Sequence, residues 1–269
     1  MEQQEEHKFP VKTGVLPFDG LLKTLKILII AALIFIISAI LFGCNKDNNK
    51  SNNDKDKGND INATYNIVAA DLSSLGKYHF SYNSDGKLIR ATADTTDIAY
   101  EYTGNTIIVT TLLSEKFHSR TIITFNSAGL ATNARTENNA DGTDWFNDAF
   151  EYNGEELSKM TNTSSSSSSP RVTTYTWLNQ NMVSVTLSSA AGLSTTTFDY
   201  YADKPRQKGD YLSFLQLFQG YEIFKNKNLL KSISDTRFVY EFEPDGNISS
   251  VAFTTGSDTR IFNYQYQYN

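Results

Sequence analysis

The sequence predicts an all-β domain over residues 65–269, a strongly curved antiparallel meander or barrel-like roll with one short helix. Three observations predict it. Apolar and polar residues alternate with a period of two in segment after segment. Turn signals rich in Asn, Asp and Gly separate these segments. The apolar faces are large and aromatic, so the sheet must curl on itself or be covered to keep them out of water.

The alternation is clearest in four segments, which we expect to be strands with one apolar and one mostly polar face. They are 78–82, 98–102, 238–242 and 262–268. The last segment carries four aromatic residues on one face and Asn or Gln on the other. We therefore expect it to lie in the sheet with its rings inward.

One hairpin pattern occurs three times in the sequence, and we call it the hairpin unit. An aromatic residue ends a strand, a four-residue turn comes next, and then another strand begins, as in Tyr82–Leu88, Phe125–Ala131 and Phe242–Ile248. Such short connections predict that most strands pair with their sequence neighbours. A serine-rich run at 163–169 instead predicts a flexible loop.

The one helical pattern runs from Asp210 to Gly220. Asp210 can cap its first turn, and Gly220 can end it. Leu212, Leu215 and Phe218 would share one apolar face, which Phe214 and Leu217 would widen. We expect this helix to plug one end of the sheet or to cover one of its faces.

The first 43 residues resemble a lipoprotein signal peptide. Two lysines precede an uncharged apolar run, Ile27 to Gly43, as in a signal sequence. The run ends in Leu41–Cys44, which resembles a bacterial lipobox. That resemblance implies a diacylglyceryl group on the thiol of Cys44 and cleavage between Gly43 and Cys44.

An uncleaved membrane helix is the alternative, because the apolar run is close to the shortest bilayer span of about 17 residues. Both interpretations place the chain from Asn45 onward outside the cytoplasm. Met1 to Gly20 is long and acidic at its start for a signal peptide, so we expect the functional start nearer Leu21.

Residues 44–64 are expected to be the lipidated cysteine and a disordered linker, because 45–60 contain no apolar residue. Lys46 and Asp47, directly after the lipobox, resemble the surface-export signal of Bacteroidetes lipoproteins. This favours an outer-membrane protein, lipid-anchored and exposed at the cell surface.

Composition excludes several classes of function. The formal net charge is −6, and the segment before Cys44 holds equal numbers of basic and acidic residues, so the exported part stays acidic. Nucleic acid is excluded as a partner, because its phosphates need a basic surface. Cys44 is the only cysteine, so disulfides and cysteine-based zinc sites are excluded as well. We predict no cofactor.

No catalytic constellation stands out, so we predict that the protein is not an enzyme. His79 and His118 lie in no motif with a serine or an acid. Glu155 and Glu156 are adjacent in sequence, so they should point to opposite faces of a strand and make a poor glycosidase pair.

The segment from Glu137 to Asp148 partly resembles a calcium-binding loop. Its oxygen ligands would be Glu137, Asn139, Asp141 and Asp148, with Gly142 at the sharp turn. The first and last ligand types differ from the calcium pattern, and no helices flank the loop. We favour a polar hairpin loop and predict no metal site.

Three aromatic residues are candidates for binding a ligand. Trp145 and Phe146 come directly after the polar loop, and an exposed pair beside carboxylates and amides could stack on a sugar ring. The alternative, which we favour, is that Trp145 folds back as a lid on the sheet. Trp177 is the third candidate.

These features together are similar to the Bacteroidetes lipoproteins of unknown function whose domain has a porin-like fold. After the lipobox and tether come strands such as Tyr100–Ile107 and a late leucine-rich helix. Asn228–Ile233, Tyr240–Gly246 and the closing Tyr264–Tyr266 come last. The resemblance covers Tyr65 to Asn269. It implies a curved antiparallel sheet or barrel-like roll and supplies no catalytic residues.

The predicted function is that of a lipid-anchored envelope lipoprotein acting as a non-catalytic binding module. Its partner would be the membrane through Cys44, together with a glycan or a protein of an uptake system. The alternative is a structural or interaction protein of the outer envelope without a small ligand. A concave groove beside Trp145 or Trp177 would favour the first function, and a filled interior would favour the second.

Overall fold

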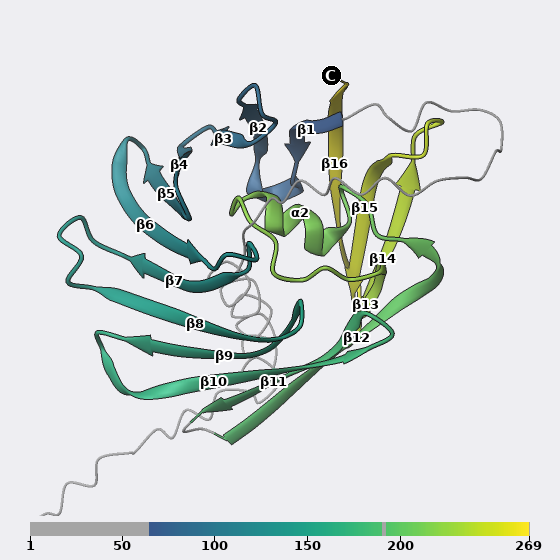
Figure 1. Ribbon diagram of the computed structural model, residues 1–269. Helices are drawn as coiled ribbons and strands as arrows, with labels where there is room; N and C mark the ends of the chain where they lie inside the picture. Colours follow the sequence, from purple (N-terminus) through teal and green to yellow (C-terminus); the bar gives the residue numbers. More distant parts are fainter. Residues whose placement is uncertain (1–64, 190–191, 269) are drawn as a thin grey trace, which may run out of the picture. The chain divides into compact units, whose positions relative to one another are not determined.

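Sixteen antiparallel strands close into a barrel in the computed structural model, which describes residues 65–189 and 192–268 (Figure 1). Each strand pairs with its sequence neighbours, and the last strand pairs with the first to close the ring. The all-β fold with one short helix is confirmed. The strands are β1 (Tyr65–Asp71), β2 (Lys77–Tyr82), β3 (Leu88–Ala93), β4 (Thr96–Thr103), β5 (Thr106–Leu113), β6 (Lys116–Phe125), β7 (Ala131–Glu137), β8 (Trp145–Asn153), β9 (Glu156–Ser164), β10 (Ser167–Leu178), β11 (Asn181–Ser189), β12 (Gly192–Pro205), β13 (Asn228–Ile233), β14 (Thr236–Phe242), β15 (Ile248–Thr255) and β16 (Asp258–Tyr268).

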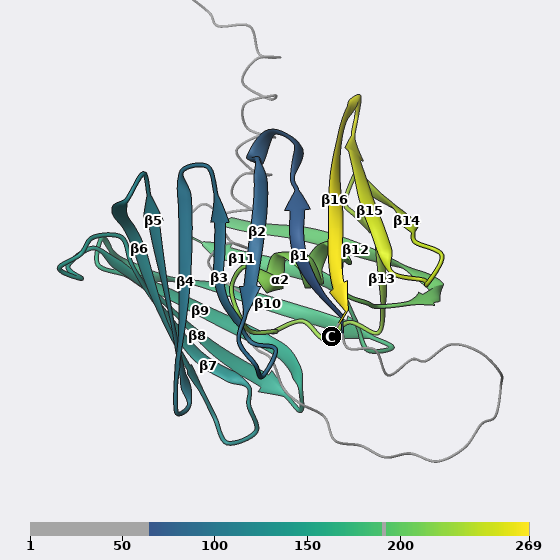
Figure 2. The ribbon, with the colours of Figure 1, turned by 90° about the horizontal axis from the view of Figure 1, so that it is seen from above.

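Alternation along each strand separates a buried inner face from an exposed outer face. In β14, Phe238 and Tyr240 are buried, whereas Val239 between them is 59% exposed. In β16, Phe262 and Tyr264 are buried as expected. Figure 2 shows β6 to β1 and then β16 side by side, where the first and last strands join.

The barrel has two different ends. Because every strand is antiparallel to the next, successive turns lie at opposite ends. The turns after β2, β4, β6, β8, β10 and β14 lie at one end with the segment 206–227, and we call this the plugged end. All three copies of the hairpin unit turn there. In two of them an Asn side chain makes the turn, since Oδ1 of Asn83 and of Asn126 each accepts two backbone N–H groups.

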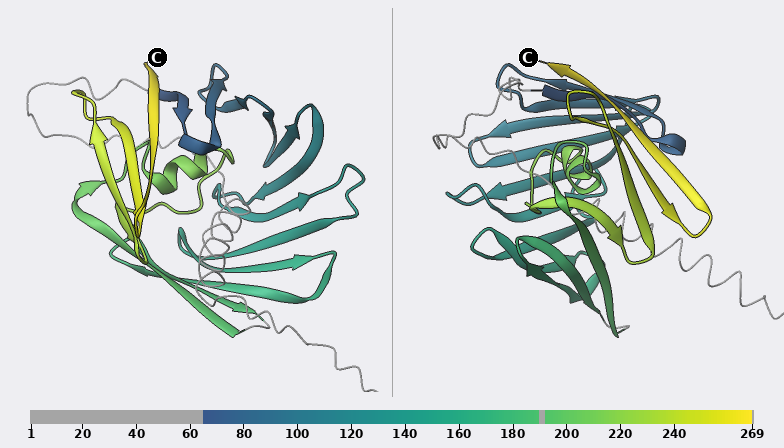
Figure 3. Two further views of the ribbon diagram at one scale, coloured as in Figure 1. Left: turned by 180° about the vertical axis from the view of Figure 1, so that it is seen from behind. Right: turned by 90° about the vertical axis from the view of Figure 1, so that its right-hand side faces the viewer.

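The helix α2 (Tyr211–Leu217) lies inside the ring of strands, as both views in Figure 3 show. The Asp210 side chain accepts from the Ser213 N–H, so the predicted cap is confirmed. The buried helical residues are Tyr211, Leu212, Phe214 and Gln216. Leu212 and Phe214 belong to the expected apolar face, whereas Leu215, Leu217 and Phe218 of that face are only partly buried. A helix enclosed by a barrel is contacted from several sides, so no single stripe holds its core.

The loop prediction for the serine-rich run was wrong. The strands β9 and β10 continue through it to Ser164 and from Ser167, and these two residues pair across a tight turn. Serine is small and its side chain faces solvent here, so backbone pairing with the neighbouring strand sets the structure. A register shift between Ser167 and Arg171 accommodates Pro170.

In the part of the chain that the structure describes, no helix is long and apolar enough to cross a membrane. The signal peptide, Gly43, Cys44 and the tether to residue 64 lie outside the described residues, so their predictions stand as expectations.

Candidate functional site

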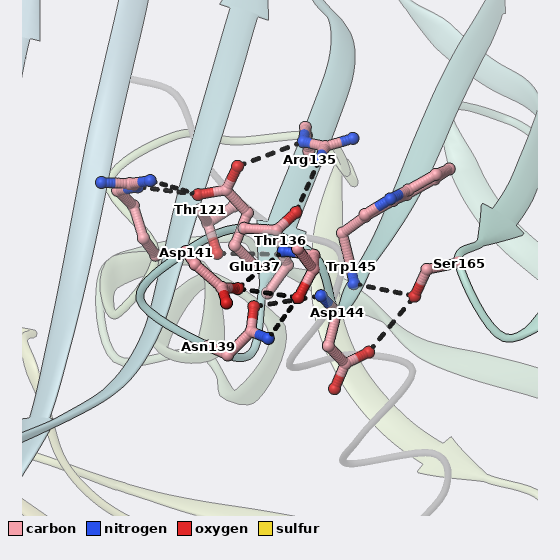
Figure 4. A network of polar contacts seen from close by, with 12 residues as sticks. Thr121, Arg135, Thr136, Glu137, Asn139, Asp141, Asp144, Trp145 and Ser165 are labelled. Carbon is pink, nitrogen blue, oxygen red and sulfur yellow. Dashed lines mark hydrogen bonds and ion pairs between the residues drawn. The ribbon is translucent and has the colours of Figure 1, made fainter.

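Trp145 and Phe146 do not form a pair, because they point to opposite faces of β8. Phe146 is in register with the inward Thr136, whereas Trp145 is in register with Glu137 on the outer face. The Arg135 guanidinium lies over the Trp145 ring, 4.6 Å from the ring centroid (Figure 4). Trp145 is half-buried on the outer surface of the sheet.

Glu137 fixes the arginines around Trp145. Its Oε2 accepts from Nε and Nη2 of Arg120 at 2.8 and 2.6 Å, and its Oε1 accepts from Nε of Arg135 at 3.2 Å. Hydrogen bonding from Arg120 is the main cause that lowers the pKa of Glu137. Gly142 covers this carboxylate with φ +70°, and a Cβ there would come within 2.9 Å of Glu137 Oε1. The turn therefore requires glycine.

The candidate calcium ligands do not converge. Glu137 is occupied by arginines, and Asp141 Oδ1 accepts from the N–H and hydroxyl of Thr143. Asn139 Oδ1 accepts from the Asp144 N–H, and Asp148 is buried on the inner face of the barrel. Over residues 65–189 and 192–268, no group of three or more His, Cys, Asp and Glu could hold a metal. The segment is a hairpin loop braced by its own polar side chains.

Trp177 lies at the plugged end, at the opposite end of the barrel from Trp145. Its Nε1–H donates to the Leu157 carbonyl at 2.8 Å, which fixes the orientation of the ring. The ring borders a hollow of about 390 Å³, which we call the Trp177 hollow. The hollow is lined by Asn153, Glu155, Glu156, Trp177, Gln180 and Lys225.

Glu155 and Glu156 both line the Trp177 hollow, although we expected them on opposite faces. Glu155 belongs to the turn between β8 and β9, so strand alternation does not apply to it. Lys225 Nζ lies 2.9 Å from Glu155 Oε2, which brings a residue 70 positions away into the hollow. The site therefore offers an indole face, two carboxylates, two amides and an ammonium group.

Two further hollows at the plugged end were missed by sequence reasoning. The Tyr82 hollow, about 330 Å³, lies between the barrel rim and α2 and includes Tyr82, Lys87, Tyr102 and Lys208 in its lining. The Phe125 hollow, about 350 Å³, shares Lys87 and Tyr102 with it and continues to Phe125. Tyr82 and Lys87 both belong to the first copy of the hairpin unit, so the repeat could have pointed to this part of the chain.

Tyrosines fix the rim of the plugged end. Four of them donate a hydroxyl hydrogen bond to a backbone carbonyl of a neighbouring strand or its flank at 2.7–2.8 Å. The pairs are Tyr82 with Ile67, Tyr102 with Leu88, Tyr200 with Met182 and Tyr266 with Ile248. These bonds hold the aromatic rings in place, so the hollows between them are preformed.

Two aspartates are buried inside the barrel, each 1% exposed. Burial raises the pKa of Asp148 to about 7, against a weaker opposing effect from the Asn162 amide that donates to Oδ1. Burial also raises the pKa of Asp210, which caps α2 and accepts from Leu230 N–H and the Tyr240 hydroxyl. Neither aspartate borders one of the three hollows.

His79 and His118 are exposed strand residues. The first lies on β2 and the second on β6, and neither imidazole forms a hydrogen bond or ion pair with another described residue. The structure therefore does not bring them together with a nucleophile or an acid.

The outer face of the barrel carries charged and hydroxyl side chains. Cross-strand ion pairs link Arg90 to Asp97, Lys159 to Glu151 and Lys231 to Asp199 at 2.6–2.9 Å. Threonine pairs on the same exposed faces, such as Thr186 with Thr195, hydrogen-bond across strands at 3.0 Å. Apolar side chains fill the inner face around α2 instead.

Comparison with known proteins supports the fold. No family model matches the chain, and no curated protein matches it. The chain is similar to a porin-like protein from Bacteroides uniformis, with a TM-score of 0.53 and 14% identity over 75% of this chain and 98% of that chain. At this identity the likeness shows the porin-like β-barrel fold alone. A match to the Photorhabdus luminescens Tc holotoxin pore has a TM-score of 0.24, covers 68% of this chain and 12% of that chain at 11% identity, and carries no argument.

Proposed function

We propose that this protein is a lipid-anchored, non-catalytic carbohydrate-binding module of the bacterial outer envelope, and that the Trp177 hollow binds the sugar. The observation that carries the proposal is the hollow itself, in which a fixed indole face stands beside carboxylates and amides. An aromatic face packs against the C–H groups of a sugar ring, while polar side chains bond its hydroxyls. Of the three predicted aromatic candidates, Trp177 alone borders a described hollow.

The surroundings of the carboxylates in the Trp177 hollow favour a binding role over catalysis. Glycoside hydrolysis needs one carboxylic acid that donates a proton and a second carboxylate across the scissile bond. Glu155 is paired with Lys225 and its side chain is 73% exposed, so its oxygens can accept hydrogen bonds from sugar hydroxyls. Glu156 adds a second carboxylate to the lining of the same hollow.

The lipid anchor is proposed from the lipobox at Leu41–Cys44 and from the character of the barrel wall. Barrels that span a membrane carry an apolar band on their outer face and a polar interior. Here the outer face carries ion pairs, and the inner face is apolar around α2. This distribution favours a barrel in water that is held to the membrane through Cys44, at the outer membrane and on the cell surface.

The test of sugar binding is an array of immobilised oligosaccharides probed with the full chain in detergent, and then calorimetry on the best ligand. Trp177→Ala should weaken binding at least tenfold, because the indole platform is lost. Trp145→Ala is the matched control at the other end of the barrel and should leave affinity unchanged. Equal losses in both variants, or no sugar bound by the wild type, would refute the proposal.

The anchor is tested separately by metabolic labelling with a fatty-acid probe. The wild type should be labelled, and Cys44→Ser should not be. Equal labelling of both proteins would exclude lipidation at this residue.

A structural or interaction protein of the envelope is the second candidate, and the filled core around α2 favours it. Phe214 is 1% exposed and contacts several aromatic rings, so this part of the interior has no room for a ligand. Under this alternative the surface hollows would have no sugar ligand, and the wild type would bind no oligosaccharide on the array.

A further inference from the structure

The Tyr82 and Phe125 hollows lie next to each other at the plugged end, and we call the pair the tract. Lys87 and Tyr102 line both of them, so these two side chains stand between the hollows. Together they offer about 330 and 350 Å³, which is room for more than one sugar ring. The tract shares no lining residue with the Trp177 hollow.

The charge in this tract is positive, although the protein is acidic. Of the residues that line the Phe125 hollow, Lys87 is the one with a charge. Its Nζ lies 5.2 Å from the centroid of the Tyr102 ring, and no described carboxylate forms an ion pair with it. In the Tyr82 hollow, Arg206 is paired with Glu222, and Lys208 Nζ donates to the Tyr65 carbonyl and to Asn66 Oδ1, so Lys87 is the cation on which the argument rests. An ammonium group in a concave surface attracts an anion.

The aromatic walls of the tract are rigid. The Tyr102 hydroxyl donates to the Leu88 carbonyl at 2.8 Å, and Phe125 packs edge-on against Tyr221 at 5.4 Å between ring centroids. Rings that are already fixed lose little freedom when a ligand binds. A sugar ring laid on Tyr102 would bring a substituent directly to Lys87.

We propose that this tract binds a carboxylate-bearing sugar unit, with the carboxylate on Lys87 Nζ and the ring against Tyr102. The inference rests on the proposed function, since it makes the plugged end selective for acidic glycans. It uses different residues, however, and can fail while sugar binding at Trp177 holds.

The experiment is calorimetric titration of the full chain in detergent with trigalacturonate and with its methyl ester. The two probes share every ring and linkage and differ in the charge of the carboxyl groups. The wild type should bind the acid at least tenfold more tightly than the ester. This preference should shrink as salt is raised from 50 to about 500 mM, because salt screens exposed charges.

Three variants assign the preference to Lys87. Lys87→Met should reduce the ratio of the two affinities to near one, and Lys87→Arg should keep it because the charge remains. Lys116→Met removes an exposed lysine at the opposite end of the barrel and should leave the ratio as in the wild type. Thermal melting of each variant checks that the fold is retained.

The result that overturns the inference is an acid-to-ester ratio near one in the wild type, or a ratio that persists in Lys87→Met. Failure of the wild type to bind either probe overturns it as well. A neutral sugar that still binds, and is lost in Trp177→Ala, would then show that the proposed function stands without acid selectivity.

Discussion

Two walls of the barrel hold their buried groups in different ways. The helix wall, formed by β2 and β14–β16, packs aromatic rings against α2, whereas the opposite wall, β7–β10, carries buried polar groups. The two aspartates make the contrast plain. Asp210, which caps α2, accepts from the Ser213 and Leu230 N–H groups and from the Tyr240 hydroxyl. Asp148, on β8, accepts from Asn162, and its Oδ2 has no hydrogen-bond partner among the described residues.

This contrast indicates where the barrel gains stability. On the helix wall, burial of aromatic rings dominates, so that side is the packed core, and the Tyr264 hydroxyl is a buried group there without a hydrogen-bond partner among the described residues. On the opposite wall, Asp148 Oδ2 and Thr173 Oγ1 are buried without a hydrogen-bond partner among the described residues, which costs free energy. Substitutions on the two walls should therefore change the free energy of unfolding by different amounts, and in one case in opposite directions.

The largest effect is expected for Phe214→Ala. Phe214 is 1% exposed, and its ring contacts those of Phe80, Phe262 and Tyr264 at 4.8–6.1 Å between centroids. Loss of this ring should cost about 3–5 kcal/mol of unfolding free energy. Urea unfolding monitored by near-UV circular dichroism measures it.

Phe150→Ala is the matched substitution on the opposite wall. Phe150 is 6% exposed and makes no ring contact within the described part of the chain. Its loss should cost at least about 1 kcal/mol less than that of Phe214, because no aromatic pairs are broken. Equal costs would contradict the division into a packed wall and a polar wall.

A change of opposite sign is expected for Asp148→Asn. The folded-state pKa of Asp148 is about 7, above its ordinary value of 3.8. The unfolded chain therefore loses this proton first, and stability falls as pH rises from about 4 to about 7. Asparagine removes this penalty, so the variant should be more stable than the wild type by about 2–4 kcal/mol at pH 8, and no more stable at pH 4. Urea unfolding at both values measures it.

Asp210→Asn tests whether the gain belongs to the wall or to any buried aspartate. The Asp210 carboxylate accepts from donors on both oxygens, and an amide NH₂ would face one of these donors. This variant should lose about 1–3 kcal/mol at pH 8. A gain in both variants would show that desolvation, rather than the number of hydrogen bonds, decides the effect.

Most of the strand order could be predicted from sequence, because its causes are local. Alternation assigned the inward rings of β16, and Asp210 supplied the cap of α2. Closure of the barrel could not be predicted, since it depends on pairing between β1 and β16 across the whole domain. The serine-rich run was mistaken for a loop because composition alone does not show which neighbouring strand is available for pairing.

The candidate site was predicted only in part. Trp177 was named, but its hollow depends on Lys225, which reaches Glu155 from 70 residues away. Lys87 and Tyr102 meet across the hairpin of β3 and β4, and their contact depends on a strand register that the sequence does not show. The placement of Trp145 and Phe146 on opposite faces could have been predicted, because adjacent residues of a strand point to opposite sides of the sheet.

The smallest effect concerns the outer face of the opposite wall, where Glu137 and Glu151 both pair with cations across strands. The Glu137 side chain is 9% exposed and bonds two arginines, whereas that of Glu151 is 60% exposed and bonds one lysine. Glu137→Gln should cost about 1–2 kcal/mol at pH 7, because it weakens charge-assisted bonds in a shielded place. Glu151→Gln should cost about 0–0.5 kcal/mol, as exposed ion pairs usually do.

The pH dependence of this comparison comes from Glu137. Because hydrogen bonds from Arg120 and Arg135 lower the pKa of Glu137, the stability that its ion pairs contribute is present above the ordinary carboxylate range and is lost as the pH falls below that range. The difference between the two variants should therefore shrink in urea unfolding as the pH is lowered below the ordinary carboxylate range. A difference that persists there would assign the effect to packing of the loop around Gly142 rather than to charge.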